Sequence, residues 1–506
     1  MEVLFYFLAL PFLFLLSLYL INTSKHKPKT KTKTGFKTYP ILGVLPDFLK
    51  NKFRFLDWTT EILINAPNNT AVLYRPSRIH SIITANPDVV EYILKTNFEN
   101  YPKGENQFII FLKDFLGRGI FNSNGDLWKF QRKTSLHEFN TKSLRKFCVE
   151  NAGIEISTRL IPMIAKAGET GQVLDLQDML ERFAFDSICK LAFNVDPCCL
   201  GGDGNAGSDF MRAFEKASRL SSGRFLYPLP ILWTLKKFFN LGSEKSLRNS
   251  IKIVYDFADK IIRSRLEKQN EKKKDEDLLS RFIVDTENSP EFLRYVVISF
   301  ILAGRDTISS VLTWFFWLLA SNKEAEEKIL NELEMIRKKY RKNVGDTYTY
   351  SFDAIRDMHY LHAAISESMR LYPPVAVNTK ACLNADIQPG GTFIGKDWFI
   401  TYNTYAVGRM ESIWGKDCLE YRPDRWLENG MYRQESSFRY PIFHAGPRIC
   451  LGKDLAYVQM KAIASSIIGR FEVDVRDKEK CRESLLSLTL RMQGGLLFNA
   501  KERFVG

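Results

Sequence analysis

One cysteine near the C-terminus constrains this chain more than any other residue. It stands in the segment Phe443-His-Ala-Gly446-Pro-Arg448-Ile-Cys450-Leu-Gly452, and an amphipathic helix pattern follows from Lys453 to Met460. Glycine lacks a Cβ and tolerates positive φ, so the backbone here can approach a partner closely. Amides at the start of the helix can point at the sulfur of Cys450 and stabilise a thiolate. The alternative is a structural cysteine in a glycine-rich turn.

The residues around Cys450 suit a flat anionic cofactor better than a structural turn. A thiolate is the axial ligand that pushes electron density into haem iron and favours O–O cleavage. Arg448 can meet a haem propionate, because a planar guanidinium suits a carboxylate. Phe443, Gly446 and Gly452 complete the pattern. We therefore expect Cys450 to ligate haem iron.

The Cys450 segment resembles the haem-binding loop of cytochromes P-450, the haem-thiolate monooxygenases, which use haem b. A second segment, Glu367-Ser-Met-Arg370-Leu-Tyr-Pro-Pro374, is similar to that family's E-x-x-R helix. Glu367 and Arg370 are three residues apart and can pair on one helix face; apolar neighbours favour partial burial. The segment Tyr421–Trp426 is similar to the one that supplies a second arginine, here Arg425. The resemblance implies a structural network beneath the haem.

The segment Ala303-Gly304-Arg305-Asp306-Thr307 lies inside a long apolar helical run from Phe292 to Leu319 and resembles the family's oxygen-activation signature. A threonine in mid-helix can bond to the i−4 carbonyl and bend the helix, and Gly304 weakens the same turn. The resemblance implies a local widening that admits dioxygen and a water. Thr307 would then form a hydrogen bond with the activated oxygen, while Asp306 would connect the site to solvent protons. The alternative is an ordinary buried threonine beside a solvated aspartate.

Trp128 and Arg132 are four residues apart and share a helix face. An indole N–H and a guanidinium both donate hydrogen bonds and accept none, which suits a propionate. With the other motifs, the pair fits the family's haem-contacting helix.

The composition is that of a globular protein with a large core, since 45% of the 506 residues are hydrophobic. Helical periodicity dominates, and β-like stretches occur at Ala71–Tyr74, Ile79–Ile83, Trp398–Tyr402 and near the C-terminus. We therefore predict a mainly α domain with small β-sheets, which agrees with the cytochrome P-450 fold that the resemblance implies.

The sequence pattern indicates that the N-terminal segment is a separate structural element. Residues Val3 to Ile21 form an uncharged apolar run, close to the ~20 residues that a membrane-spanning helix needs. Glu2 and the lack of a small-residue cleavage site argue against a removed signal peptide. We predict a transmembrane signal anchor at 1–21, a basic linker at 22–39 and a catalytic domain at 40–506. Lysines after the anchor place the catalytic domain in the cytosol, with the endoplasmic reticulum as the expected membrane.

The formal net charge is +14, and subtracting the six lysines of the linker leaves +8 elsewhere. We find no nucleic-acid-binding motif, so an acidic redox partner is the better candidate. The resemblance implies an NADPH-dependent cytochrome P-450 reductase, a flavoprotein that docks on the thiolate side of the haem. Charge would steer this encounter through a set of basic residues there: Lys129, Arg132, Lys133, Lys453 and the arginines near Arg425.

Several segments resemble the plant branch of the family that hydroxylates fatty acids at or near the terminal carbon. They are Asn100–Gly104, Phe115–Phe121, Ala303–Thr307, Tyr405–Gly415 and Arg491–Gly495. That branch also includes enzymes acting on jasmonate conjugates and steroid side chains, so the lipophilic substrate stays open. Two rival functions also stay open: an O₂-independent enzyme that rearranges hydroperoxides, and a non-catalytic haem-binding membrane protein. The intact Asp306–Thr307 pair argues against the first.

Overall fold

The structure is a computed structural model that describes residues 35–39, 42–75, 80–139, 142–201, 205–227, 229–269, 278–284, 288–340, 349–479 and 482–503. The predicted anchor at 1–21 and most of the predicted linker at 22–39 lie outside these residues. Within them, helices dominate and the sheets are small, which confirms the predicted fold class.

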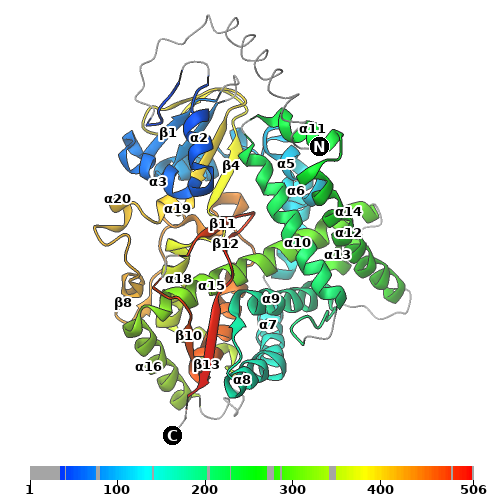
Figure 1. Ribbon diagram of the computed structural model, residues 1–506, viewed down its shortest axis with the longest axis vertical. Helices are drawn as coiled ribbons and strands as arrows, with labels where there is room; N and C mark the ends of the chain where they lie inside the picture. The colour runs from blue at the N-terminus through cyan, green and yellow to red at the C-terminus, as the bar shows by residue number, and fades with distance from the viewer. Residues whose placement is uncertain are drawn as a thin grey trace, which may run out of the picture.

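The largest sheet has the strand order β1-β2-β7-β4. Its strands are β1 (Thr70–Leu73), β2 (Ser81–Thr84), β7 (Phe399–Asn403) and β4 (Val377–Ala381). The β2–β7 pair is parallel and the other two pairs are antiparallel. Three of these strands match the predicted β-like stretches to within two residues. In Figure 1 the sheet lies with α2 and α3 at one end of the molecule.

The remaining strands form one further three-stranded sheet and short hairpins. The three-stranded sheet joins β10 (Phe471–Val475), β13 (Leu497–Glu502) and β3 (Leu174–Asp175). The two-stranded pairs are β5 (Asp386–Ile387) with β6 (Phe393–Ile394), β8 (Leu427–Glu428) with β9 (Met431–Tyr432), and β11 (Ser484–Leu486) with β12 (Leu490–Met492).

Helices make up the body of the protein. Those of the described residues are α2 (Leu45–Asn51), α3 (Phe55–Asn65), α4 (Pro87–Glu91), α5 (Ile110–Leu116), α6 (Gly125–Phe139), α7 (Lys142–Glu155), α8 (Ile161–Thr170), α9 (Leu176–Phe193), α10 (Asn205–Gly223), α11 (Pro230–Phe238), α12 (Gly242–Gln269), α13 (Leu278–Val284), α14 (Pro290–Ile301), α15 (Thr307–Ala320), α16 (Lys323–Lys339), α17 (Phe352–Arg356), α18 (His359–Leu371), α19 (Thr404–Val407), α20 (Glu411–Trp414) and α21 (Lys453–Arg470).

The helix predicted from the apolar run Phe292–Leu319 forms the centre of the fold. It begins where the Ser289 side chain caps the amide of Phe292 and Pro290 occupies the first turn. It continues through α14, a π-helical turn η9 (Leu302–Asp306) and α15. Within the described residues this is the helix long and apolar enough to cross a membrane, but 83% of its most apolar window is buried in the protein. Its hydrophobic character is therefore that of a core helix.

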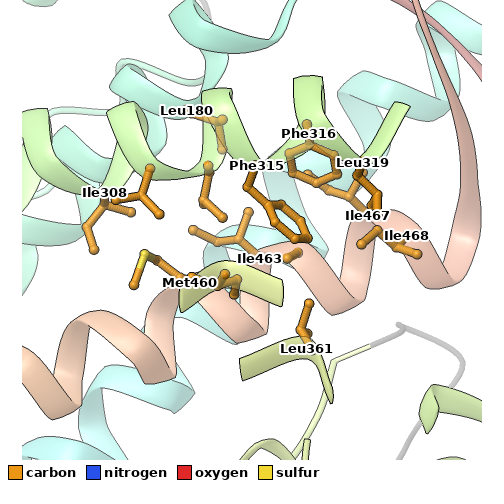
Figure 2. Packing of buried hydrophobic residues seen from close by; sticks show 14 of the residues in the cluster. Leu180, Ile308, Phe315, Phe316, Leu319, Leu361, Met460, Ile463, Ile467 and Ile468 are labelled. Carbon is orange, nitrogen blue, oxygen red and sulfur yellow. The ribbon is translucent and has the colours of Figure 1, made fainter. Parts of the chain in front are cut away.

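The main hydrophobic core lies where α15 meets α9, α18 and α21. Phe315 and Phe316 of α15 pack with Ile463 and Ile467 of α21, and all four are essentially inaccessible to solvent. Figure 2 shows these side chains gathered between the helices. Each such side chain contributes about 1.5–3 kcal/mol through burial. The packing fixes the position of α21, and hence of the Cys450 segment at its N-terminus.

Candidate functional site

The Cys450 segment forms a tight loop that leads directly into α21. The amide of Cys450 donates a hydrogen bond to the carbonyl of Phe443 at 2.8 Å, and Gly452 occupies the N-cap of α21. Gly446 has a φ of +63°, and a Cβ there would collide with the carbonyl of Leu94. Glycine is therefore required at 446 both by conformation and by space.

The environment of the Cys450 sulfur favours metal ligation. Burial raises the pKa of the thiol, whereas a hydrogen bond from the Gly452 amide and the charges of Arg132 and Lys453 lower it. The net effect is a raised pKa, although the residue as a whole is exposed. A bound iron would deprotonate the thiol outright, and the nearby cations and the helix N-terminus would then stabilise the thiolate.

Three of the predicted haem-contacting residues come together beside this loop. The guanidinium of Arg448 lies 4.3 Å from the ring centroid of Trp128, and that of Arg132 lies 5.9 Å from the same centroid. Arg448 also donates hydrogen bonds to the carbonyl of Ser123 at 2.9 Å and to Oδ1 of Asn124 at 3.2 Å. Phe443 packs against Tyr457 of α21 with a centroid separation of 5.3 Å.

Two buried lysines join Arg132 and Arg448 to form what we call the cation cluster: Lys103, Arg132, Lys380 and Arg448. Lys380 is fully buried and its Nζ has no hydrogen-bond partner among the described residues. The Nε of Arg448 is likewise buried and unpartnered there. Burial and neighbouring cations lower the pKa of Lys103 to about 7 and that of Lys380 well below its usual value.

The cation cluster fits the propionates of a haem group. Among the described residues, no acidic side chain forms an ion pair with any of its four members. Buried charges are ordinarily paired, because an isolated buried cation is costly. A dianionic cofactor would provide the missing partners. The sequence motifs indicated Trp128, Arg132 and Arg448 but missed Lys380, whose signal is a lysine inside the half-buried strand β4.

The Glu367–Arg370 pair lies in the core and is bound by a second arginine, as the motifs predicted. Both side chains are inaccessible to solvent, and Glu367 Oε2 accepts from Arg370 Nε at 2.8 Å. Arg425 Nε donates to Glu367 Oε1 at 2.8 Å, and Trp426 Nε1 donates to Oε2 at 2.9 Å. Arg370 further donates to the carbonyls of Gly408, Cys418 and Glu420. These bonds tie α18 to the segment that precedes the Cys450 loop.

The turn η9 separates α14 from α15 at the segment singled out for oxygen activation. Its π-helical geometry inserts one extra residue per turn, which widens the helix locally. Thr307 Oγ1 donates to the carbonyl of Ala303 at 2.6 Å, the i−4 bond expected for a threonine in mid-helix. Gly304 faces α9 so closely that a Cβ there would clash with the side chain of Ile188. The sequence pattern therefore predicted the position of the irregularity.

Asp306 is buried in a cluster of charges and does not face solvent. Its Oδ1 accepts from Arg305 at 2.6 Å, and Arg305 also donates to Glu181 of α9 at 2.9 Å. Arg491 of β12 lies 2.6 Å from the other oxygen of Glu181. Burial raises the pKa of Asp306 and raises that of Glu181 to about 7. The sequence missed this cluster because Glu181 and Arg491 lie far from residue 306 along the chain.

Aromatic side chains in and beside α5 and just after α10 form what we call the aromatic wall: Phe108, Phe111 and Phe225. Phe111 stacks on Phe225 with a centroid separation of 4.6 Å, and Phe108 lies 5.2 Å from the same ring. Behind the wall, the buried Arg224 donates to the carbonyl of Phe111 and pairs with Asp114 and Glu244. These bonds hold α5 against the end of α10 and the start of α12.

Comparison with known proteins agrees with the site. The family model for cytochrome P450 matches residues 69–497. The chain is 49% identical to "Cytochrome P450 CYP94D108" of Paris polyphylla over 92% of this chain and 91% of that protein. It is 44% identical to "Cytochrome P450 94A1" of Vicia sativa over 92% and 90%, and 44% identical to "Cytochrome P450 94C1" of Arabidopsis thaliana over 90% and 90%. The chain belongs to the cytochrome P450 family of haem-thiolate monooxygenases, which receive their electrons from NADPH through a reductase.

Proposed function

We propose that this monooxygenase hydroxylates a terminal or near-terminal carbon of a lipophilic chain, with a fatty acid as the first candidate substrate. The observation that carries the proposal is the placement of Cys450 at the start of α21, beside buried and half-buried cations that have no acidic partner among the described residues. The likeness of several segments to the plant fatty-acid hydroxylase branch supports the choice of substrate, as do the 94-series relatives. A jasmonate conjugate or a steroid side chain is the alternative.

The haem, when bound, supplies oxygen activation with O₂ and reductase-delivered electrons; the protein supplies position and environment. Cys450 would ligate the iron. Trp128, Arg132 and Arg448 would hold the propionates, and we add Lys103 and Lys380 to that set. The Glu367, Arg370 and Arg425 network fixes the backbone that leads to the ligand loop.

Thr307 and Asp306 are the two residues to which we assign roles in proton transfer. The hydroxyl of Thr307 donates its proton in a hydrogen bond to the carbonyl of Ala303. Its lone pairs therefore remain free to accept a hydrogen bond from a second donor. Asp306 is buried in a charge cluster, so protons from solvent must pass through that cluster. Thr307 would accept a hydrogen bond from a donor in the site, and Asp306 would supply protons during oxygen activation.

Substrate selection would rest on the aromatic wall of Phe108, Phe111 and Phe225 with the apolar face of α14. Ile298 of α14 is fully buried and Ile109 nearly so. Pockets for small molecules are mostly apolar with few polar groups. A wall of this kind binds a hydrocarbon chain and excludes water from the carbon to be oxidised.

We extend the proposal to the redox partner and to the cellular location of the protein. Lys129 and Lys133 are exposed on α6, and Lys453 starts α21 next to the ligand loop. These cations would steer an acidic flavoprotein reductase to the thiolate side of the haem. Residues 1–21 would anchor the chain in the endoplasmic reticulum membrane with the catalytic domain in the cytosol.

Two measurements test the proposed function. First, dodecanoic acid, a jasmonate–amino acid conjugate and a sterol are titrated into the purified protein, and the shift of the haem spectrum identifies the binder. Second, the labelled binder is incubated with NADPH, reductase and O₂, and the products are identified. Hydroxylation at or next to the terminal carbon supports the proposal. Product formed from a hydroperoxide without O₂ or NADPH would establish the rearranging enzyme instead, and no turnover of any of the three would favour a non-catalytic haem protein.

A further inference from the structure

The buried charges around Asp306 extend to helix α10. We define the Asp306 charge cluster as Glu181, Glu215, Arg305, Asp306 and Arg491. Arg491 bridges two acids: it lies 2.6 Å from Glu181 and 3.3 Å from Glu215 of α10. The chain of contacts therefore runs from Glu215 on α10 through Arg491, Glu181 and Arg305 to Asp306.

Helix α10 touches the same region at two further points. The ring of Phe214 lies 5.5 Å from the guanidinium of Arg305, a distance at which a cation and an aromatic face attract. The buried hydroxyl of Ser218 lies 3.1 Å from that of Ser487, in the turn between β11 and β12. Helix α10 cannot move away from α9 and the β11–β12 hairpin without breaking these contacts.

The charges of the cluster do not balance. Two arginines face three carboxylates, and all but Glu215 and Arg491 are less than a tenth exposed. Burial raises the pKa of Asp306 and of Glu181, so a proton resides readily in the cluster. The Nε of Arg305 has no hydrogen-bond partner among the described residues. Among the described residues, the hydrogen bonds of Arg305 are thus made by its two terminal nitrogens, to Glu181 and Asp306.

These contacts link the hold on Asp306 to Glu215 of α10. Arg491 of β12 engages Glu181 of α9 and Glu215 of α10 at the same time. Without the Glu215 carboxylate, Arg491 can shift, and the electrostatic field at the Glu181 carboxylate then changes. Because Arg305 bonds to both Glu181 and Asp306, its hydrogen bond to Asp306 changes as well. Interactions between buried charges are weakly screened, so a change of charge at Glu215 is felt along these contacts as far as Asp306.

We propose that Glu215 and Arg491 are positioning residues that, through Glu181 and Arg305, hold Asp306 in place for proton delivery. The inference rests on the proposed role of Asp306 and Thr307. Correct placement of Asp306 would limit the release of reduced oxygen as hydrogen peroxide.

The test uses the full-length holoenzyme with reductase and the strongest binder among the three compounds above, at saturating concentration. Glu215→Gln removes the charge but keeps the shape, and the 37% exposure of this side chain makes a folding defect small. The matched control is Asp209→Asn, which removes an acid on the same helix whose ion pair with Arg212 is on the surface. The readouts are product formed per NADPH consumed, hydrogen peroxide release and the solvent isotope effect on kcat.

We expect Glu215→Gln to keep the carbon monoxide spectrum of the thiolate-ligated haem, to lower product per NADPH at least threefold and to increase the solvent isotope effect. Asp209→Asn should match the wild type. In a double-mutant cycle, adding Glu215→Gln to Arg491→Gln should cause no further loss, because both act through one contact. Equal or higher product per NADPH in Glu215→Gln would overturn the inference.

Thr307→Ala, measured in parallel, separates the two proposals. Loss of coupling in Thr307→Ala with none in Glu215→Gln contradicts the link to α10 and leaves the proposed function intact. Unchanged coupling in both variants contradicts the role assigned to the Asp306–Thr307 pair itself.

Discussion

Lys380 shows how a single side chain can reveal what a protein binds. It is fully buried on β4, and its Nζ has no hydrogen-bond partner among the described residues. Removing a charge from water costs several kcal/mol per ion unless a partner compensates. The nearest charged groups that affect it are other cations, Lys103 and Arg448. Lys380 keeps its charge readily only if an anion completes the arrangement, which is the role we assign to a haem propionate.

Lys380→Met tests this assignment. The substitution keeps the stem of the side chain and removes the charge, so we expect haem to leave about tenfold faster, since a hydrogen bond to a charged group is worth about 1.5–3 kcal/mol. The measurement is the rate of haem transfer to an acceptor such as apomyoglobin. Lys129→Met on the exposed face of α6 is the control. A transfer rate equal to that of the wild type would remove Lys380 from the haem site.

Thr307 is the residue on which the proposed oxygen chemistry depends. Thr307→Ala removes the hydroxyl that donates to Ala303 and leaves the rest of α15 unchanged. We expect normal haem content and the normal carbon monoxide spectrum. Product per NADPH should fall about tenfold or more, because general acid–base groups contribute on the order of 10²–10⁴ to rate. Undiminished product would show that the hydroxyl takes no part.

At the scale of an element, the central helix depends on close contact with α9. At Gly304, in the π-helical turn, an added Cβ would come within 2.8 Å of three atoms of Ile188. Overpacking of a core site costs about 1–3 kcal/mol. The glycine therefore lets η9 approach α9, and this approach brings Arg305 within reach of Glu181.

Gly304→Val should lower the free energy of unfolding by about 1–3 kcal/mol and reduce haem content. Ile188→Ala, which creates space opposite position 304, should be destabilising alone but should restore part of the loss when combined with Gly304→Val. Denaturant titration of the four proteins measures the coupling. Additive effects of the two substitutions would show that the predicted contact does not limit packing.

The elements differ in how far sequence alone could place them. The apolar run Phe292–Leu319 predicted the central helix, and Gly304 with Thr307 predicted where it becomes irregular, because both signals are local. The network of Glu367, Arg370 and Arg425 could be proposed only through family motifs, since its members come from separate segments. The roles of Arg491 and Lys380 were not predicted, for a related reason. Only folding brings Arg491 to Glu181 and Lys380 close to Arg448.

At the scale of the whole molecule, the described residues form a helical body with a small sheet-rich part at one end (Figure 1). The family model covers residues 69–497, so the catalytic machinery lies C-terminal to the predicted anchor and linker. Within the described residues, the apolar helix Pro290–Ala320 belongs to the core. The proposed attachment to a membrane therefore depends on the segment at 1–21.

Deletion of residues 1–21 tests the anchor. We expect the full-length protein to stay with membranes after a high-salt wash and a carbonate wash, because a membrane-spanning helix is held by burial of about 20 apolar residues. The shortened protein should retain its haem spectrum and be released by salt, since only the linker lysines could hold it to anionic lipid. Retention of the shortened protein after both washes would place the attachment elsewhere.

The most direct test of the account is the haem content and carbon monoxide spectrum of the purified wild type and of Cys450→Ala. The account predicts stoichiometric haem in the wild type, with the spectrum of a thiolate-ligated iron once reduced. It also predicts loss of that spectrum and of haem retention in Cys450→Ala. A wild type without haem, or a Cys450→Ala variant that keeps the thiolate spectrum, would contradict it.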